Sequence, residues 1–169
     1  MDPFETLGLP ARFDLEEGAI RRAYLARVGA VHPDAAGGEG EQASALNEAR
    51  AILSDPERRA GALLARLGGP TKESDRSLPD GFLAGMMEVR EEVESDLARG
   101  GDEARRRWEV WATNRRSEYE RRVAEAFAGL GDPPSAAGLR AIRMELNAWR
   151  YVERLIEQLD PQYDATREA

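Results

Sequence analysis

The segment that decides the fold spans residues 17–34 and reads EGAIRRAYLARVGAVHPD. Its apolar positions recur at intervals of four, four and three residues, and they are Ile20, Tyr24, Val28 and Val31. This spacing places them on one face of an α-helix. Pro33 ends that helix, because proline cannot continue it. The segment therefore predicts an amphipathic helix followed by a loop that carries the tripeptide His32-Pro33-Asp34.

The rest of the chain also shows helical spacing, and no stretch alternates between apolar and polar residues as a strand does. Helices are expected over residues 3–7, 16–32, 41–54, 56–67, 79–99, 102–128 and 136–159. Asp55-Pro56 is a start signal, since aspartate caps a helix and proline is tolerated at its first position. Gly100-Gly101 separates two of the long helices. The fold class is predicted to be all-α.

Two domains are expected, because a polar stretch rich in Gly, Pro and Ser interrupts the helices. The N-terminal domain covers residues 1–69, the linker 70–78 and the C-terminal domain 79–169. The second domain contains three long helices joined by short loops, which is typical of an antiparallel three-helix bundle.

The composition excludes several classes of function. The net charge is −8, so a general nucleic-acid binder is not expected. Cysteine is absent, which rules out disulfides, thiolate metal sites and an iron–sulfur cluster held by thiolates. No apolar run is long enough to span a membrane, and residues 1–10 do not resemble a secretory signal. We expect a cytoplasmic protein without cofactor or metal and without nucleic-acid or membrane partners.

The His-Pro-Asp tripeptide would be an ordinary turn if it stood alone, but it lies within an ordered array of signals. PFETLGL at residues 3–9 precedes it, Arg21-Arg22-Ala23-Tyr24 lies before it, and LNEARAILSDPERRA at residues 46–60 follows it. This array resembles the J-domain of DnaJ. The resemblance implies a helical hairpin with short flanking helices that binds a DnaK-class chaperone and stimulates its ATPase.

The implied chaperone-binding residues are the loop and the basic face of the preceding helix, namely His32, Pro33, Asp34, Arg21, Arg22 and Arg27. The basic face is thinner than in many J-domains, since Leu25, Ala26 and Ala30 stand where others carry Lys or Arg. Val31 and Ala35 also depart from the usual residues beside the tripeptide. A catalytic His32 is not expected, because no nucleophile, metal cluster or phosphate loop accompanies it. The chain is therefore predicted not to be an enzyme.

The helix that begins near Pro79 carries two apolar stripes. The first suits a bundle core and consists of Phe82, Met86, Val89, Val93 and Leu97. The second consists of Leu83, Met87 and Glu91, joined by Ala84 and Glu88. Spacing alone favours the interpretation that the second stripe widens the core. The alternative is an exposed partner site, with Tyr151 and Leu155 of the last helix exposed beside it.

Three segments resemble HscB, the J-domain co-chaperone of iron–sulfur cluster assembly: residues 4–12, 82–92 and 149–155. In that family the C-terminal bundle binds the IscU-type scaffold protein, and the J-domain passes scaffold and cluster to the HscA-type ATPase. The implied scaffold-binding residues are Leu83, Ala84, Met87, Glu88, Glu91 and Tyr151. Ala84 and Tyr151 depart from the usual methionine and phenylalanine.

Two other functions remain open from the sequence. The bundle could recruit a different client while the J-domain acts as described. Alternatively, the chain could be a structural helical protein with a degenerate J-domain, and the thin basic face is the feature that supports this interpretation.

Overall fold

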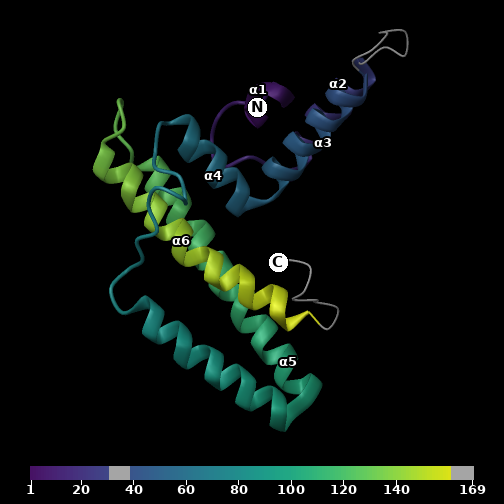
Figure 1. Ribbon diagram of the computed structural model, residues 1–169. Coiled ribbons are helices and arrows are strands. Elements are labelled where there is room, and N and C mark those ends of the chain that lie inside the picture. The colour runs from purple at the N-terminus through teal and green to yellow at the C-terminus, as the bar shows by residue number, and fades with distance from the viewer. Residues whose placement is uncertain (31–38, 161–169) are drawn as a thin grey trace.

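The computed structural model describes residues 1–30 and 39–160, and throughout these ranges the secondary structure is helical (Figure 1). The elements are α1 (Pro3–Leu7), α2 (Glu17–Ala30), α3 (Glu39–Ser54), α4 (Pro56–Arg66), α5 (Phe82–Ala128) and α6 (Ala136–Leu159). The all-α prediction is confirmed. His32, Pro33 and Asp34 lie outside the described residues, as do Val31 and Ala35.

The N-terminal part is a hairpin of α2 and α3 with α1 packed against it. Asp2 caps α1 by accepting a hydrogen bond from the backbone N–H of Phe4 at 2.9 Å. Phe4, Ile20 and Leu53 are fully buried and join the three helices. The outer ends of α2 and α3 point away from the rest of the molecule (Figure 1). The end of α2 that precedes the His-Pro-Asp tripeptide in the sequence is therefore remote from the bundle.

Helix α4 begins and ends where the sequence predicts. The Asp55 side chain accepts the N–H of Arg58 at 3.0 Å, and Pro56 follows it. At the other end the chain reverses through Gly68, whose φ of 76° favours glycine. The N–H of Gly69 donates to the carbonyl of Leu64 at 2.9 Å, which closes a Schellman motif. This reversal sends the chain into the linker.

The substitution Gly69→Ala is expected to destabilise the protein by about 1–3 kcal/mol. A Cβ on Gly69 would lie 2.3 Å from Cδ1 of Leu64, which is buried and cannot move freely. Gly61→Ala, in the same α4, meets no atom within 4 Å and is expected to stabilise the helix by about 0.5–1 kcal/mol. Urea denaturation followed by circular dichroism measures the free energy of unfolding of both variants. Equal changes of the same sign would contradict the close contact between Gly69 and Leu64.

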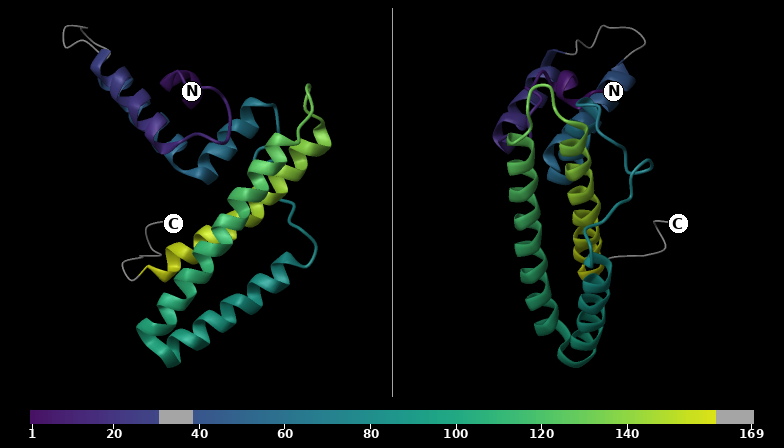
Figure 2. Two further views of the ribbon diagram at one scale, coloured as in Figure 1. Left: turned by 180° about the vertical axis from the view of Figure 1, so that it is seen from behind. Right: turned by 90° about the vertical axis from the view of Figure 1, so that its left-hand side faces the viewer.

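Helix α5 consists of two arms that meet at a sharp kink. Gly101 has φ 51° and ψ −131°, a conformation that no other residue type adopts readily. Figure 2 shows the two arms doubling back beside each other, with α6 alongside. The predicted break at Gly100-Gly101 is confirmed, and we call residues 82–100 the first arm.

The two arms and α6 form the predicted bundle. Where the three helical segments meet, the buried side chains form a cluster that consists of Met86, Val93, Ala112, Leu155 and Leu159. The alternative in which Leu155 is exposed is wrong for this residue, because its side chain is only 2% exposed. Helix α6 contacts both arms of α5. Leu155, which the spacing within α6 places off the core face, therefore packs against the first arm.

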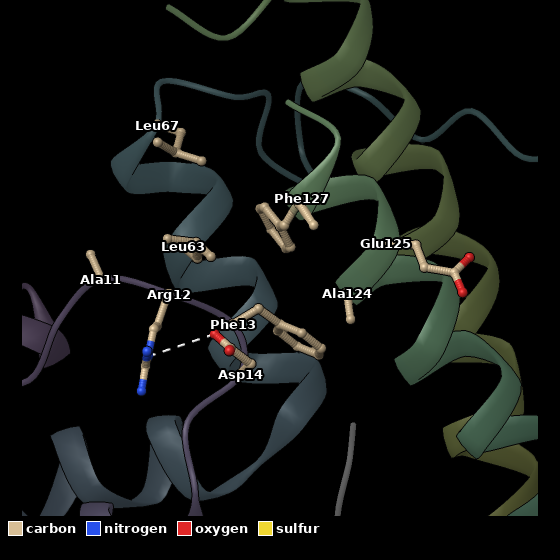
Figure 3. A pocket seen from close by; sticks show the side chains of 10 residues that line it. Ala11, Arg12, Phe13, Asp14, Leu63, Leu67, Ala124, Glu125 and Phe127 are labelled. Atoms are coloured by element: carbon tan, nitrogen blue, oxygen red, sulfur yellow. Dashed lines mark ion pairs between the residues drawn. The ribbon is translucent and has the colours of Figure 1, made fainter. Parts of the chain in front are cut away.

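The N-terminal helices and the bundle share one continuous core. Phe13, before α2, stacks on Phe127 at the end of α5 with ring centroids 5.9 Å apart. Leu63 of α4 lies beside these rings, as Figure 3 shows. A cavity of about 520 Å³ remains next to them. Because buried apolar contacts cross between the two parts, the J-domain-like hairpin is held on one end of the bundle.

Candidate partner-binding surfaces

The exposed face of α2 combines basic and apolar side chains. Arg21 and Arg22 are exposed, and no carboxylate of the described residues lies within ion-pair distance of them. Leu25 and Val28 are also exposed. Arg27 is exposed but lies over the end of α1, where a Cβ on Gly8 would come within 2.4 Å of its guanidinium. This face presents positive charge and apolar contact area together, which suits an acidic partner surface.

The first arm of α5 carries the second apolar stripe on its outer side. Leu83 is 50% exposed and Met87 is 58% exposed. The interpretation that they widen the core is therefore wrong. Ala84, Glu88 and Glu91 are exposed as well, so the structure gathers all five residues on accessible helix surface. A helix face that binds no partner rarely exposes two neighbouring large apolar side chains to water, and this face does so.

Tyr151 joins this surface from α6. It is half-buried, and its ring meets Phe82 edge-on with centroids 5.5 Å apart. Phe82 immediately precedes Leu83, so the tyrosine borders the apolar stripe at the start of the first arm. Of the two lateral residues predicted on α6, Tyr151 stays partly accessible and Leu155 does not.

Acidic residues follow the stripe along the first arm. Glu88, Glu91, Glu92 and Asp96 line a shallow groove along the first arm, together with Ser95 and Arg99. Within residues 1–30 and 39–160, no group of three or more His, Asp or Glu side chains is placed to hold a metal ion. In the same ranges, no helix is both long enough and apolar enough to cross a membrane.

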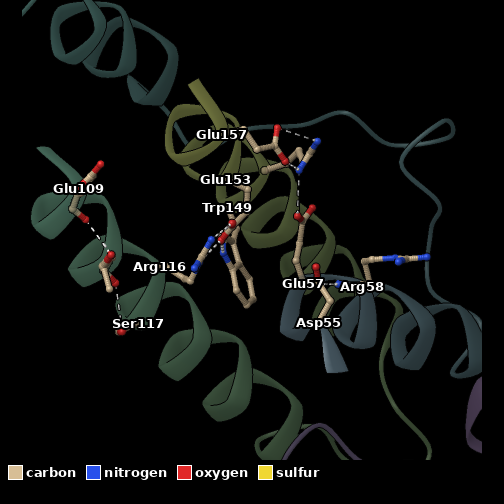
Figure 4. A network of polar contacts seen from close by, with 11 residues as sticks. Asp55, Glu57, Arg58, Glu109, Arg116, Ser117, Trp149, Glu153 and Glu157 are labelled. Carbon is tan, nitrogen blue, oxygen red and sulfur yellow. Dashed lines mark hydrogen bonds and ion pairs between the residues drawn. The ribbon is translucent and has the colours of Figure 1, made fainter. Parts of the chain in front are cut away.

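A polar network that was not predicted from the sequence joins α4 to the bundle (Figure 4). Glu57 of α4 lies 3.6 Å from Arg150 of α6, and Arg150 also binds Glu157 at 2.9 Å. Nearby, Glu153 accepts hydrogen bonds from Nε1 of Trp149 and from Nε of Arg116, both at 2.7 Å. Glu57 and Arg150, like Arg116 and Glu153, lie far apart in the sequence, so no local pattern signals the contacts between the helices.

Burial raises the pKa of Glu57 to about 7, and the attraction of Arg150 opposes the rise only in part. Between the ordinary value of 4.5 and about 7, the folded protein then binds more protons at this site than the unfolded chain. The contribution of Glu57 to stability is therefore present at low pH and is lost as the pH rises through this window.

The substitution Glu57→Gln is expected to change stability in a pH-dependent way. At pH 8 the variant should be about 1 kcal/mol more stable than the wild type, because an uncharged amide replaces a partly buried carboxylate and the lost attraction to Arg150 reduces the gain. At pH 5 the two proteins should be nearly equal. Urea denaturation at both pH values measures the difference, and a difference that does not vary with pH would contradict the assignment.

Comparison with known proteins gives consistent matches along the chain. The model of the DnaJ domain matches residues 2–61, and the model of the HSCB C-terminal oligomerisation domain matches residues 78–160. The co-chaperone protein HscB homolog of Bordetella petrii is 33% identical, over 94% of both chains. The homolog of Burkholderia multivorans is 35% identical, over 95% of this chain and 93% of its own.

Two solved structures share the fold. Chaperone HscB from Vibrio cholerae superposes with a TM-score of 0.76 and 25% identity, over 95% of this chain and 96% of its own. Human co-chaperone protein HscB superposes with a TM-score of 0.75 and 19% identity, over 94% of this chain and 80% of its own. The second likeness is one of fold alone.

Proposed function

The chain belongs to the HscB family of J-domain co-chaperones, which act in iron–sulfur cluster assembly, and from this premise we propose how its surfaces divide the work. The first arm of α5 binds an IscU-type scaffold protein through Leu83, Ala84, Met87, Glu88 and Glu91, with Tyr151 of α6 beside them. The N-terminal hairpin binds a DnaK/HscA-class chaperone and stimulates its ATPase.

The single observation that carries the scaffold site is the exposure of Leu83 and Met87 on the arm whose Phe82 packs on Tyr151. Burying two such side chains in a complex removes apolar area from water, and each contributes about 1.5 kcal/mol or more. The acidic residues around them add a polar rim that fixes the orientation of a partner. An apolar centre with a charged rim is the usual anatomy of a specific protein interface.

On the chaperone side, we propose that His32, Pro33 and Asp34 act with Arg21, Arg22 and Arg27. Proline stiffens the tripeptide, so that less conformational freedom is lost when the imidazole and carboxylate bind. The arginines raise the rate of encounter with an acidic surface in a salt-dependent way. In this proposal residues 1–69 form the J-domain, 70–78 the linker and 79–169 the scaffold-binding bundle. The chain works in the cytoplasm and catalyses no reaction of its own.

Isothermal titration of the full chain with an IscU-type scaffold protein tests the scaffold half of the proposal. We expect one binding event with a dissociation constant in the micromolar range, as is common for transient complexes with small interfaces. If the scaffold does not bind while the chain still stimulates a DnaK-class ATPase, the scaffold assignment is wrong and the bundle serves a different client.

A further inference from the structure

A groove runs between α4, the linker and α6, and Glu57, Arg150 and Glu157 of the polar network form part of its lining. Its volume is about 540 Å³. Six cationic side chains line it, and they are Arg58, Lys72, Arg76, Arg143, Arg150 and Arg154. Only three acidic side chains, Asp55, Glu57 and Glu157, accompany them. This is a concentration of positive charge in a chain whose net charge is −8.

The acids of the groove are already engaged. Glu57 and Glu157 both pair with Arg150, and Asp55 caps α4. Among the described residues, no carboxylate lies within ion-pair distance of the guanidinium groups of Arg58, Arg76, Arg143 or Arg154. In Figure 4 the side chain of Arg58 points away from the network. Lys72 pairs with Glu73 at 3.9 Å, and Glu57, Asp75 and Glu73 lie near enough to Arg143 to act on its charge. The cations of the groove that make no ion pair within the described residues are therefore Arg58, Arg76, Arg143 and Arg154.

The linker is fixed in place, so the groove has a defined shape. The side-chain amide of Asn147 on α6 donates to the carbonyls of Asp75 and Ser77, both at 3.0 Å. Thr71 and Ser74 close a turn next to Lys72. These bonds hold Lys72 and Arg76 opposite the α6 arginines. On α6, Arg143 is half-buried, and its Nε is inaccessible and has no hydrogen-bond partner among the described residues.

We propose that this groove binds an extended acidic segment of a partner polypeptide. Arg143 and Arg154 mark the ends of a row about 16 Å long, at 1.5 Å per helical residue. A single phosphate is much shorter, whereas about five residues of extended chain span that length at 3.3 Å each. Leu78, Leu146 and Tyr151 also line the groove, so it offers apolar contact between the charges. A peptide with alternating carboxylate and apolar side chains matches the lining of this groove better than a sugar–phosphate backbone does.

The proposal does not depend on the identity of the client, and the test uses the full chain with a synthetic probe. A dye-labelled peptide of alternating glutamate and leucine, eight residues long, is titrated with the protein and followed by fluorescence anisotropy. The double variant Arg143→Gln/Arg154→Gln is expected to bind about tenfold more weakly than the wild type, and the binding should weaken further as salt rises.

The matched control is Arg106→Gln/Arg121→Gln, which removes the same charge from two exposed positions on α5. Its affinity should stay within about twofold of the wild type, and unchanged melting curves verify that both variants fold. The proposal is overturned if the control loses as much affinity as the groove variant. It is also overturned if the peptide does not bind, if inorganic phosphate displaces it at equal concentration, or if an oligothymidylate probe binds more tightly.

Discussion

Replacing Trp149 with alanine is expected to lower the free energy of unfolding by about 3–5 kcal/mol, the range for large aromatic residues removed from a core. The side chain is 1% exposed and stacks on Tyr119 with ring centroids 6.4 Å apart. Trp149 belongs to the core that joins the bundle to the N-terminal helices, so the cavity would weaken both parts. Urea denaturation followed by far-ultraviolet circular dichroism measures the loss.

Trp149→Phe is the control for this prediction. It keeps an aromatic ring against Tyr119 but removes the indole N–H that donates to Glu153. Glu153 retains its bonds to Arg116, so a loss of only about 1–2 kcal/mol is expected. If the alanine variant were as stable as the phenylalanine variant, Trp149 would not be part of the shared core.

Changing Leu83 and Met87 together to serine is expected to weaken scaffold binding by about a hundredfold. Each side chain contributes about 1.5 kcal/mol when it is buried in a complex, and every 1.4 kcal/mol is a factor of ten in affinity. The stability of the free protein should change little, because both side chains are exposed in it. Titration calorimetry measures the affinity, and thermal unfolding measures the stability.

Val110→Ser serves as the matched control, since Val110 lies on the same helix α5 and is 62% exposed. It is outside the proposed surface, so its substitution should leave scaffold affinity within about twofold. An unchanged affinity of the Leu83/Met87 double variant would remove the scaffold surface from the first arm and favour recruitment of another client.

The helices and their ends were predictable from the sequence because local signals determine them. Asp55-Pro56 begins α4, and the glycines at 68 and 69 end it. Gly101 adopts the strained backbone that separates the two arms of α5. In each case one residue's conformational preference decides the outcome without help from distant contacts. The core stripe of α5, in which Met86 and Val93 are buried, likewise follows from its spacing.

The features that could not be predicted from the sequence depend on contacts between segments that lie far apart in the chain. Leu155 is buried because α6 contacts both arms of α5, and spacing within α6 alone carries no information about that arrangement. The pairing of Glu57 with Arg150 and the groove lined by Arg143 and Arg76 join segments from three different elements. The exposure of Leu83 and Met87 also required the structure, since their spacing fitted a wide core equally well.

The shared core has a consequence for how the two partner surfaces work together. Stacking of Phe13 on Phe127 and the pairing of Glu57 with Arg150 tie the J-domain to the bundle. The outer end of α2 and the first arm of α5 lie at opposite ends of the molecule (Figure 1). In the proposed function, a client on the first arm therefore leaves the outer end of α2 accessible to the chaperone, so that both partners can be bound at once.

The most direct test of the account is the ATPase rate of a DnaK/HscA-class chaperone, measured with the IscU-type scaffold and either the wild-type chain or its His32→Gln variant. We predict that the wild type stimulates ATP turnover and that the variant does not, while both bind the scaffold with the same affinity. Full stimulation by the His32→Gln variant would contradict the claim that this chain acts on the chaperone through its J-domain.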